Sequence, residues 1–396
     1  MATSAEIIEA DVAIIGAGLV GLTAAIAMAK QGKQLVLIDS HANRDKDWAP
    51  TTDHWDARIY ALTEETIEWL KSLGVWHYVD ETRVQPIKAM ELWEPSRNKP
   101  LMLSAEDAYL PQMGCILESA NLMQACYQAL EASNVQLTVA SPTSLIQEAH
   151  SVEITLDQQQ HVHVKLIVAA DGAHSWVRQQ LQIGVAFKSF HQTAIVANFK
   201  AEQGHQGVAR QWFLPHETMA LLPLPNNMVS MVWAVSTERA QTLLNLSQDE
   251  LLGEVSNVSE DALGKLSLSG EVVSFVLNQQ TAESYIKDRV VLVGDAAHQV
   301  HPMAGQGVNL GFRDVMQLAS MTTKLSTMQD IGDYHFLRRY ERARKLDVVS
   351  MNTLTSGLDA LFATSSPWLQ QVTGWSMQKI NQQDWLKKQL VQTATL

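Results

Sequence analysis

Three glycines near the N-terminus have the spacing of a dinucleotide-binding turn. Gly16, Gly18 and Gly21 follow an apolar run and open an alanine-rich one. In such a turn the first glycine permits the tight bend, the second lets the backbone approach a pyrophosphate, and the third permits close helix–strand packing. Asp39 ends the next apolar run 18 residues after Gly21. A carboxylate there can accept hydrogen bonds from ribose hydroxyls, so the segment predicts a dinucleotide site.

Two more aspartates follow apolar runs later in the chain. Asp171 comes after residues 166–170, and Asp295 comes after residues 290–294. An aspartate at the end of a buried strand can hydrogen-bond the ribityl chain, which among the dinucleotides only a flavin carries. A glycine-rich loop at 305–309 then precedes a helical pattern, whose positive end would stabilise negative charge on a reduced flavin ring. The predicted dinucleotide is therefore FAD.

The elements that must position these residues are of the α/β class. Residues 12–39 read as strand, glycine turn, helix and strand, a βαβ unit, whereas residues 185–277 alternate as β-strands with a polar helix at about 237–265. We expect a Rossmann-like FAD-binding domain with an inserted β-rich substrate domain and a helical C-terminus. The expected boundaries are 1–75, 106–182 and 286–345 for the discontinuous FAD-binding domain, 76–105 and 183–285 for the β-rich substrate domain, and 346–396 for the helical C-terminal segment.

Composition excludes several classes of function. The net charge of −13 does not indicate the positively charged surface that nucleic-acid binding requires. Two cysteines, Cys115 and Cys126, form neither a disulfide framework nor a four-ligand zinc site, and we expect no metal. Residues 12–29 are uncharged, but acidic residues precede them, which argues against a signal peptide. We expect a soluble cytoplasmic protein, with peripheral attachment at the inner membrane face left open.

Two features of the chain leave their roles open. Trp212 and Trp233 in the β-rich region are candidates either for the core or for an aromatic substrate pocket. An apolar stripe near the C-terminus fits packing on the protein's own core, a homodimer or other partner surface, or an entrance for a polyprenyl tail. The residues of this stripe are Met351, Leu354, Leu358, Leu361 and Phe362.

The three separated motifs together resemble the FAD-dependent aromatic-ring hydroxylases, the single-component flavoprotein monooxygenases. The segment 56–62 is similar to the D-x-R-x-x-A-L segment of the ubiquinone-biosynthesis hydroxylases, whose arginine, here Arg58, lies near the flavin. The resemblance implies a flavin and nicotinamide nucleotide contact at Asp171 and a ribityl contact at Asp295. Family members usually carry glutamate at the position of Asp39, and many carry an arginine at 118–119 that this chain lacks. The flavin contacts implied in the loop and the helix after it are Gly305, Gly307, Val308 and Asn309.

The resemblance also implies an activity. We expect a monooxygenase that uses O₂ to hydroxylate the ring of a polyprenylated phenol in ubiquinone biosynthesis, through a C4a-hydroperoxide of the reduced flavin. Because the flavin supplies this chemistry, no catalytic side chain is named. The reductant stays open between NAD(P)H and a protein electron donor, and other ubiquinone-biosynthesis proteins and the membrane surface are candidate partners. The alternatives are a flavin-dependent reductase of an isoprenoid or other hydrophobic substrate, and a hydroxylase of a different small aromatic.

Overall fold

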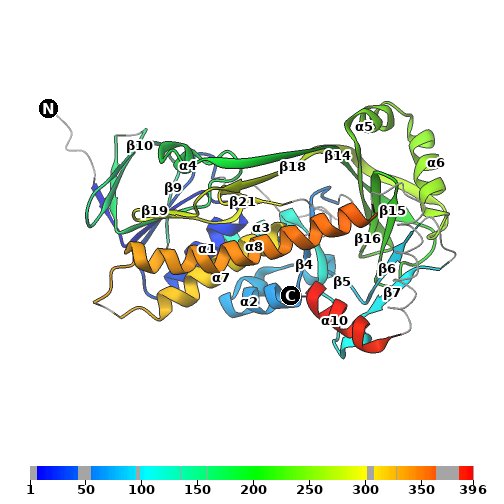
Figure 1. Cartoon of the computed structure of the whole chain (residues 1–396), viewed down its shortest axis with the longest axis horizontal. Helices are drawn as coiled ribbons and strands as arrows, with labels where there is room; N and C mark the ends of the chain where they lie inside the picture. The colour runs from blue at the N-terminus through cyan, green and yellow to red at the C-terminus, as the bar shows by residue number, and fades with distance from the viewer. Residues whose placement is uncertain are drawn as a thin grey trace.

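The computed structural model describes residues 7–42, 55–94, 99–133, 135–157, 159–300, 307–326, 328–362 and 383–395. It is a mixed α/β molecule in which a mainly parallel sheet lies at one end and a large antiparallel sheet at the other, with the long helix α8 running across one face (Figure 1). The helices are α1 (Leu19–Ala29), α2 (Glu64–Leu73), α3 (Ser119–Glu131), α4 (Trp176–Gln180), α5 (Thr237–Leu244), α6 (Gln248–Ser259), α7 (Gly307–Thr323), α8 (Tyr334–Phe362) and α10 (Asp384–Thr395), with 3-10 turns η1 (Val75–Tyr78), η2 (Glu81–Arg83), η3 (Ala105–Ala108) and η4 (Gly294–Ala296).

The first sheet has the order β19-β20-β13-β2-β3-β9, in which every pair is parallel except β19 with β20. Its central strands are short apolar runs that are buried on both faces, which is the pattern of a parallel sheet covered on both sides. Helices α1, α3 and α7 pack together beside it. The strands are β2 (Val12–Ile15), β3 (Leu35–Ile38), β9 (Gln136–Thr138), β13 (Leu166–Ala169), β19 (Ile286–Lys287) and β20 (Val290–Leu292).

Two smaller sheets flank this unit. A four-stranded sheet consists of β1 (Ile7–Glu9), β12 (His161–Val164), β11 (Val152–Leu156) and β10 (Pro142–Gln147). A three-stranded sheet consists of β4 (Ile59–Leu62), β8 (Cys115–Glu118) and β5 (Gln85–Pro86). Strand β4 of the second sheet begins directly after Arg58.

The large sheet has eight strands in the order β21-β18-β14-β17-β16-β15-β6-β7. Its two longest strands, β14 and β18, have 17 residues each and run from the region of α4 towards α5 and α6 (Figure 1). The strands are β6 (Ala89–Trp93), β7 (Leu101–Ser104), β14 (Val185–Ala201), β15 (Val208–Leu214), β16 (Glu217–Leu224), β17 (Met228–Ser236), β18 (Leu266–Ala282) and β21 (His298–Gln299).

One face of the large sheet is covered by α5 and α6. Trp212 and Trp233 lie in the apolar core between this face and the helices, together with Phe199. Both tryptophans are therefore core residues, and the pocket-lining alternative for them is wrong. The single helix expected at about 237–265 is also wrong, because Ser247 and Glu250 form a capping box that begins a second helix at Gln248.

The C-terminal part of the chain is helical, as the sequence predicts. Helix α8 packs on α7 and β19, and α10 packs on β7 and η3. The side chains from 352 to 362, which include most of the predicted apolar stripe, lie outside the described ones. Over the described ranges, no helix is both long enough and apolar enough to span a bilayer.

Candidate FAD site

The motif residues meet at one edge of the parallel sheet. Strands β20, β13, β2 and β3 are neighbours and run in the same direction, so the residues that follow them lie side by side. Gly16 follows β2 and donates its N–H to Ile38 O at 2.8 Å, and Ala170 N donates to Ile15 O at 2.8 Å. Ligands of open α/β sheets bind in the crevice at the carboxyl ends of such strands.

Two of the three glycines are required by close backbone approach. Gly16 has φ +105°, and a Cβ there would lie 2.3 Å from Ala170 O. A Cβ on Gly21 would lie 1.8 Å from Gly16 O, so α1 packs on the turn only because residue 21 is glycine. A Cβ on Gly18 would meet nothing within 4 Å, which leaves open space above the start of α1. The turn therefore presents free backbone to that space, the arrangement that binds a pyrophosphate.

The carboxylate of Asp39 lies beside the glycine turn and is hydrogen-bonded to its backbone. Its Oδ2 accepts a hydrogen bond from Ala17 N at 2.6 Å, and its Oδ1 accepts one from His41 N at 2.6 Å. Each carboxylate oxygen has a second lone pair, so both bonds leave acceptor capacity for a diol. Here the shorter aspartate reaches the turn itself.

Asp171 has one oxygen with a partner and one without. Its Oδ2 accepts from Val177 N at 3.0 Å at the start of α4, whereas its buried Oδ1 has no hydrogen-bond partner among the described residues. Burial raises the pKa of this carboxyl. Arg178 is buried nearby and joins the loop to the neighbouring strand end, donating to Ala173 O at 2.7 Å and to Ala296 O at 2.9 Å. An orphaned buried acceptor at this edge fits a hydroxyl-rich ligand.

Asp295 occupies the corresponding position after β20. Its side chain is solvent-accessible, yet protein surrounds it closely enough that burial raises its pKa; nearby Asp314 adds to this effect, and His298 and Arg58 oppose it. An accessible carboxyl at this edge of the sheet is what a ribityl-binding residue requires.

Helix α7 begins at the same edge. Gly307 is its first residue, and a Cβ there would meet nothing within 4 Å, while Val308 is half-buried. Asn309 is buried: its Nδ2 donates to Ala61 O at 2.8 Å, and its Oδ1 accepts from Thr66 Oγ1 at 2.9 Å. The Asn309 side chain thus fixes the start of α7 to the segment after Arg58. Gly305 lies outside the described residues.

Comparison with known proteins decides the family. The profile of the FAD binding domain family matches residues 9–353. The chain is 33% identical to the 3-demethoxyubiquinol 3-hydroxylase of Escherichia coli K12 over 89% of both chains. It is 34% identical to ubiquinone hydroxylase UbiL of Rhodospirillum rubrum, over 89% of this chain and 82% of that one. The chain belongs to the FAD-binding hydroxylases and monooxygenases.

Solved structures share the fold of this family. The p-nitrophenol 4-monooxygenase PnpA of Pseudomonas putida superposes with a TM-score of 0.77 at 17% identity, covering 98% of both chains. HpxO of Klebsiella pneumoniae, solved as a single-residue variant with FAD, gives 0.74 at 16% identity, also covering 98% of both. The expected α/β class, the FAD cofactor and the enzyme class are thereby confirmed.

Sequence analysis did not predict a network of buried charged side chains that surrounds Asp314, next to the loop that carries Asp295. Asp314 in α7 is fully buried and accepts from Gly294 N at 2.7 Å, His298 Nε2 at 2.7 Å and Arg344 Nε at 2.6 Å. Burial alone would raise the pKa of Asp314, but these partners together lower it. The network holds the loop that carries Asp295 against α7 and α8. A signal was present, because Arg344 falls at helical spacing with the buried Tyr340 and Val348.

A second buried pair supports the Arg58 segment. Glu118 stands where many family members have arginine, and both its oxygens accept from Arg83, at 2.6 and 2.8 Å. Glu118 Oε1 also accepts from Asp56 N at 2.7 Å, and the Arg83 guanidinium stacks on Trp55 with 4.0 Å to the ring centroid. The pair therefore fixes the backbone just before Arg58.

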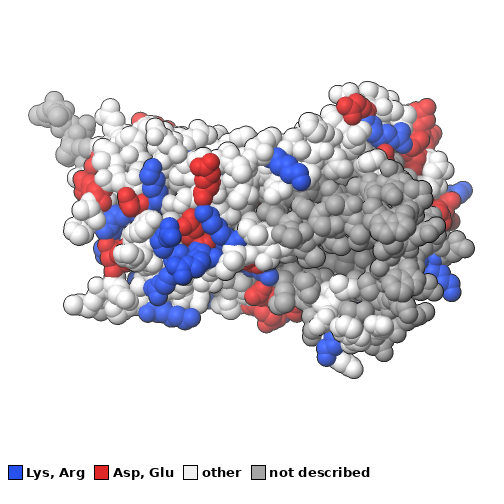
Figure 2. All heavy atoms as spheres, viewed as in Figure 1, with Lys and Arg blue, Asp and Glu red and all other residues white. Residues whose placement is uncertain are grey.

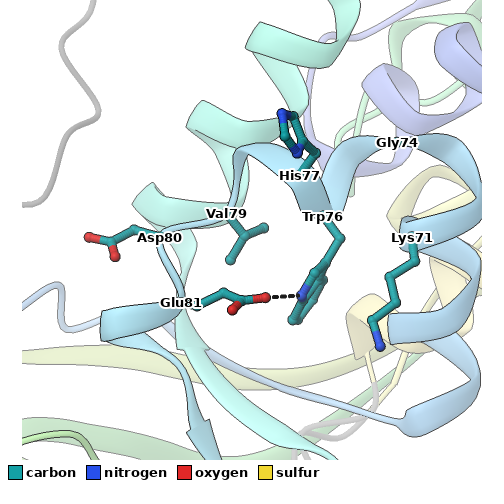
Figure 3. Close-up of a pocket in the computed structure, with 7 residues that line it drawn as sticks. All are labelled: Lys71, Gly74, Trp76, His77, Val79, Asp80 and Glu81. Atoms are coloured by element: carbon teal, nitrogen blue, oxygen red, sulfur yellow. Dashed lines mark hydrogen bonds between the residues drawn. The ribbon is translucent and has the colours of Figure 1, made fainter.

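The pocket drawn in Figure 3 lies elsewhere, at the end of α2 and along η1. It is an open hollow of about 560 Å³, and no predicted FAD residue lines it. Two of its polar side chains bond within the protein: Trp76 Nε1 donates to Glu81 Oε1 at 3.1 Å (Figure 3), and Lys71 pairs with Glu68 at 2.8 Å. We assign it no part in the chemistry. In the described ranges, no group of three or more potential metal ligands occurs.

Proposed function

We propose that this chain is an FAD-dependent monooxygenase that hydroxylates the ring of a polyprenylated phenol in ubiquinone biosynthesis. The observation that carries the proposal is the convergence of Asp39, Asp171 and Asp295 at neighbouring strand ends, on both sides of a glycine turn whose backbone is open. The relatives named ubiquinone hydroxylases match the chain over most of its length, which supports the substrate class.

The residues have separable roles in holding FAD. The glycine turn at 16–21 binds the pyrophosphate through backbone N–H groups, and Asp39 accepts the adenosine ribose hydroxyls. Asp295 binds the ribityl chain, and the orphaned Oδ1 of Asp171 accepts a further hydroxyl or amide of the cofactor. The start of α7, at Gly307 and Val308, directs N–H groups at the flavin pyrimidine. Bound FAD supplies the activation of O₂ and the transfer of one oxygen atom to the ring.

The protein must then bring a phenol to the flavin and exclude water. The face of the large sheet opposite α5 and α6 lies towards the flavin side, because Asn198 Nδ2 donates to Trp55 O at 3.2 Å and Asp56 O at 3.1 Å. Half-buried Leu222 and Val232 stand on this face. An apolar sheet on one side and Arg58 on the other would orient an electron-rich ring and keep its site dry.

The reductant is part of the same proposal. A nicotinamide nucleotide that binds transiently against the FAD domain, or a protein electron donor, would reduce the flavin; no second Gly-x-Gly-x-x-Gly follows residue 21. We favour NAD(P)H because Asp171 matches a family position to which both flavin and nicotinamide nucleotide contacts are assigned.

The decisive test is turnover of a short-chain prenylated phenol under ¹⁸O₂. Purified protein with FAD would be supplied with NADH, NADPH or a reduced protein donor, and the product analysed by mass spectrometry. A ring hydroxyl that carries one ¹⁸O supports the proposal. A product that gains two hydrogens and no oxygen would establish the isoprenoid reductase instead, and faster hydroxylation of an unprenylated phenol would establish a different aromatic substrate.

A further inference from the structure

Positive charge gathers on one face of an acidic protein. Figure 2 shows lysine and arginine side chains clustered over the N-terminal half of α8, with acidic side chains among and beside them, although the chain carries a net charge of −13. Three of these residues, Arg338, Arg339 and Arg342, are exposed. Neither the FAD site nor the substrate-facing sheet includes them, so the proposed activity does not account for them.

These arginines form a single helical face. Arg338 and Arg342 are four residues apart, Leu346 follows after four more and Val349 after three, so these side chains line up along the outside of α8. The opposite face, with Leu337, Tyr340 and Val348, is buried against the protein. From Arg338 to Val349 the row is about 17 Å long at the rise of an α-helix.

The arginines of this face have polar neighbours but, among the described residues, no ion-pair partner: Arg338 Nη1 donates to Tyr334 Oη at 3.4 Å, and Arg339 lines an open hollow together with Asp330 and Asp333. In the part of the chain that the structure describes, Arg338, Arg339 and Arg342 make no ion pair. The neighbouring cations behave differently: Arg344 pairs with Asp314 at 2.6 Å and Lys345 with Glu341 at 3.1 Å. The exposed arginines are thus available to an external anion.

Aliphatic side chains extend the cationic row. Leu346 is 67% exposed and Val349 is 61% exposed, an unfavourable placement in water for two adjacent side chains of one helix face. A helix that combines arginines with exposed aliphatic side chains on its outer face is suited to an anionic bilayer, where the guanidinium groups meet phosphates and the aliphatic groups enter the headgroup boundary.

We propose that the outer face of α8, formed by Arg338, Arg339, Arg342, Leu346 and Val349, docks this enzyme onto the surface of an anionic lipid bilayer. Charge complementarity selects this occupant, and the exposed aliphatic groups favour lipid over a purely acidic protein surface. Docking itself rests on charge and exposure alone. Its consequence for catalysis, delivery of a bilayer-dissolved substrate, rests on the proposed function.

Vesicle flotation of the full-length protein with bound FAD tests the proposal. The vesicles would contain phosphatidylcholine alone or phosphatidylcholine with phosphatidylglycerol, at low and moderate salt. We expect binding to the anionic vesicles only, weakening as salt rises. At about fivefold in affinity per arginine, R338E/R339E/R342E should lose about a hundredfold or more. L346N/V349N should weaken binding without changing its salt dependence.

The matched control changes the same net charge elsewhere. K188E/K200E/K265E replaces three exposed lysines of the large sheet and its edge, and it should bind anionic vesicles nearly as the wild type does. Thermal unfolding and flavin content would show that each variant is folded. If both triple variants lost the same affinity for anionic vesicles, binding would depend only on the overall charge of the protein, and the proposed docking face would be wrong. The proposal would also be wrong if the wild-type protein failed to float with anionic vesicles. In that case an acidic protein surface would be the better candidate partner for this face. Because binding is measured without turnover, a failed hydroxylation assay leaves this result unaffected.

Discussion

A carboxylate that must bind a cofactor can weaken the fold that holds it. Asp171 keeps Oδ1 buried without a partner, and burial raises its pKa. A raised carboxyl pKa means that the folded state favours the protonated form. The resulting destabilisation is absent below the ordinary pKa of 3.8, grows as pH rises, and is complete above the raised pKa. At neutral pH the charged side chain therefore opposes folding of the apoprotein, a loss that a bound ligand can reverse.

Asp171→Asn should therefore stabilise the apoprotein and weaken FAD binding. The amide oxygen can still accept from Val177 N, and removing the charge should recover about 1 kcal/mol, a Tm rise of roughly 2 °C in a chain of this size. The gain should shrink as pH falls towards the ordinary carboxyl pKa. Calorimetry of apoprotein and FAD titration would measure both effects. Asp288→Asn, at an exposed position, is the control, and a lower Tm in Asp171→Asn would contradict the argument.

Asp295 gives a more direct test of the cofactor assignment. Asp295→Ala removes an accessible acceptor from the sheet edge, and loss of a hydrogen bond to a charged group should weaken FAD binding by about tenfold to a hundredfold. Asp295→Asn keeps one acceptor and should bind at an intermediate level. Fluorescence quenching of FAD by apoprotein measures the affinities. If Asp295→Ala is purified with a full complement of flavin, the ribityl assignment is incorrect.

The site residues that the sequence predicts have roles set by local pattern, whereas the residues that it misses have partners distant in the sequence. Gly16 follows β2 directly, and Gly21 and Asp295 lie within six residues of a strand end, so local pattern places them at the sheet edge. Glu118 pairs with Arg83 at a separation of 35 residues, and Asp314 with Arg344 at 30, so each pair forms only when separate elements pack together. A buried charge has no local pattern of its own. Its partner is known only once the tertiary structure is known.

At the scale of elements, α7 is held against α1 by a glycine. A Cβ on Gly311 would lie 2.7 Å from Val20 Cγ2 and 3.4 Å from Gly294 Cα, so α7 approaches both the first helix and the Asp295 loop. Local propensity does not reveal this role, because glycine within a helix reads as a weak position. The break between α5 and α6 shows the reverse case, since its signal at Ser247 and Glu250 is local and was readable in the sequence.

Substitution of two helical glycines distinguishes a glycine that close packing requires from one that only lowers helix propensity. Gly311→Ala should destabilise the protein by about 1 kcal/mol or more, because it crowds Val20. Gly253→Ala, in α6 where a Cβ would meet nothing within 4 Å, should stabilise it by about 0.5–1 kcal/mol. Urea unfolding measures both. The double change Val20→Ala with Gly311→Ala should recover part of the loss, and a neutral Gly311→Ala would show that α7 and α1 are not tightly packed.

At the scale of the whole molecule, the two ends share continuous strands. The start of β14 pairs with the end of β18 near the FAD edge, where Gln280 Nε2 donates to Ala173 O at 2.9 Å, and the same two strands continue into the sheet covered by α5 and α6. Any unfolding that separates these ends must break both strands. The inserted sheet and the FAD-binding unit are therefore expected to unfold together, although the sequence predicts them as separate domains.

The two cysteines both lie in the core of the FAD-binding unit and report on its opening. Cys115 in β8 and Cys126 in α3 are buried free thiols, and burial raises both their pKa values to about 12, so neither should react with a thiol reagent at pH 8 in the folded protein. Reaction then requires opening, and FAD in excess suppresses opening in proportion to its concentration over Kd. We expect tenfold more FAD to slow labelling of both thiols about tenfold, with Cys115→Ala and Cys126→Ala assigning each rate. If one thiol instead reacts at a rate independent of FAD, its element opens locally, and the FAD-binding unit does not open as a whole.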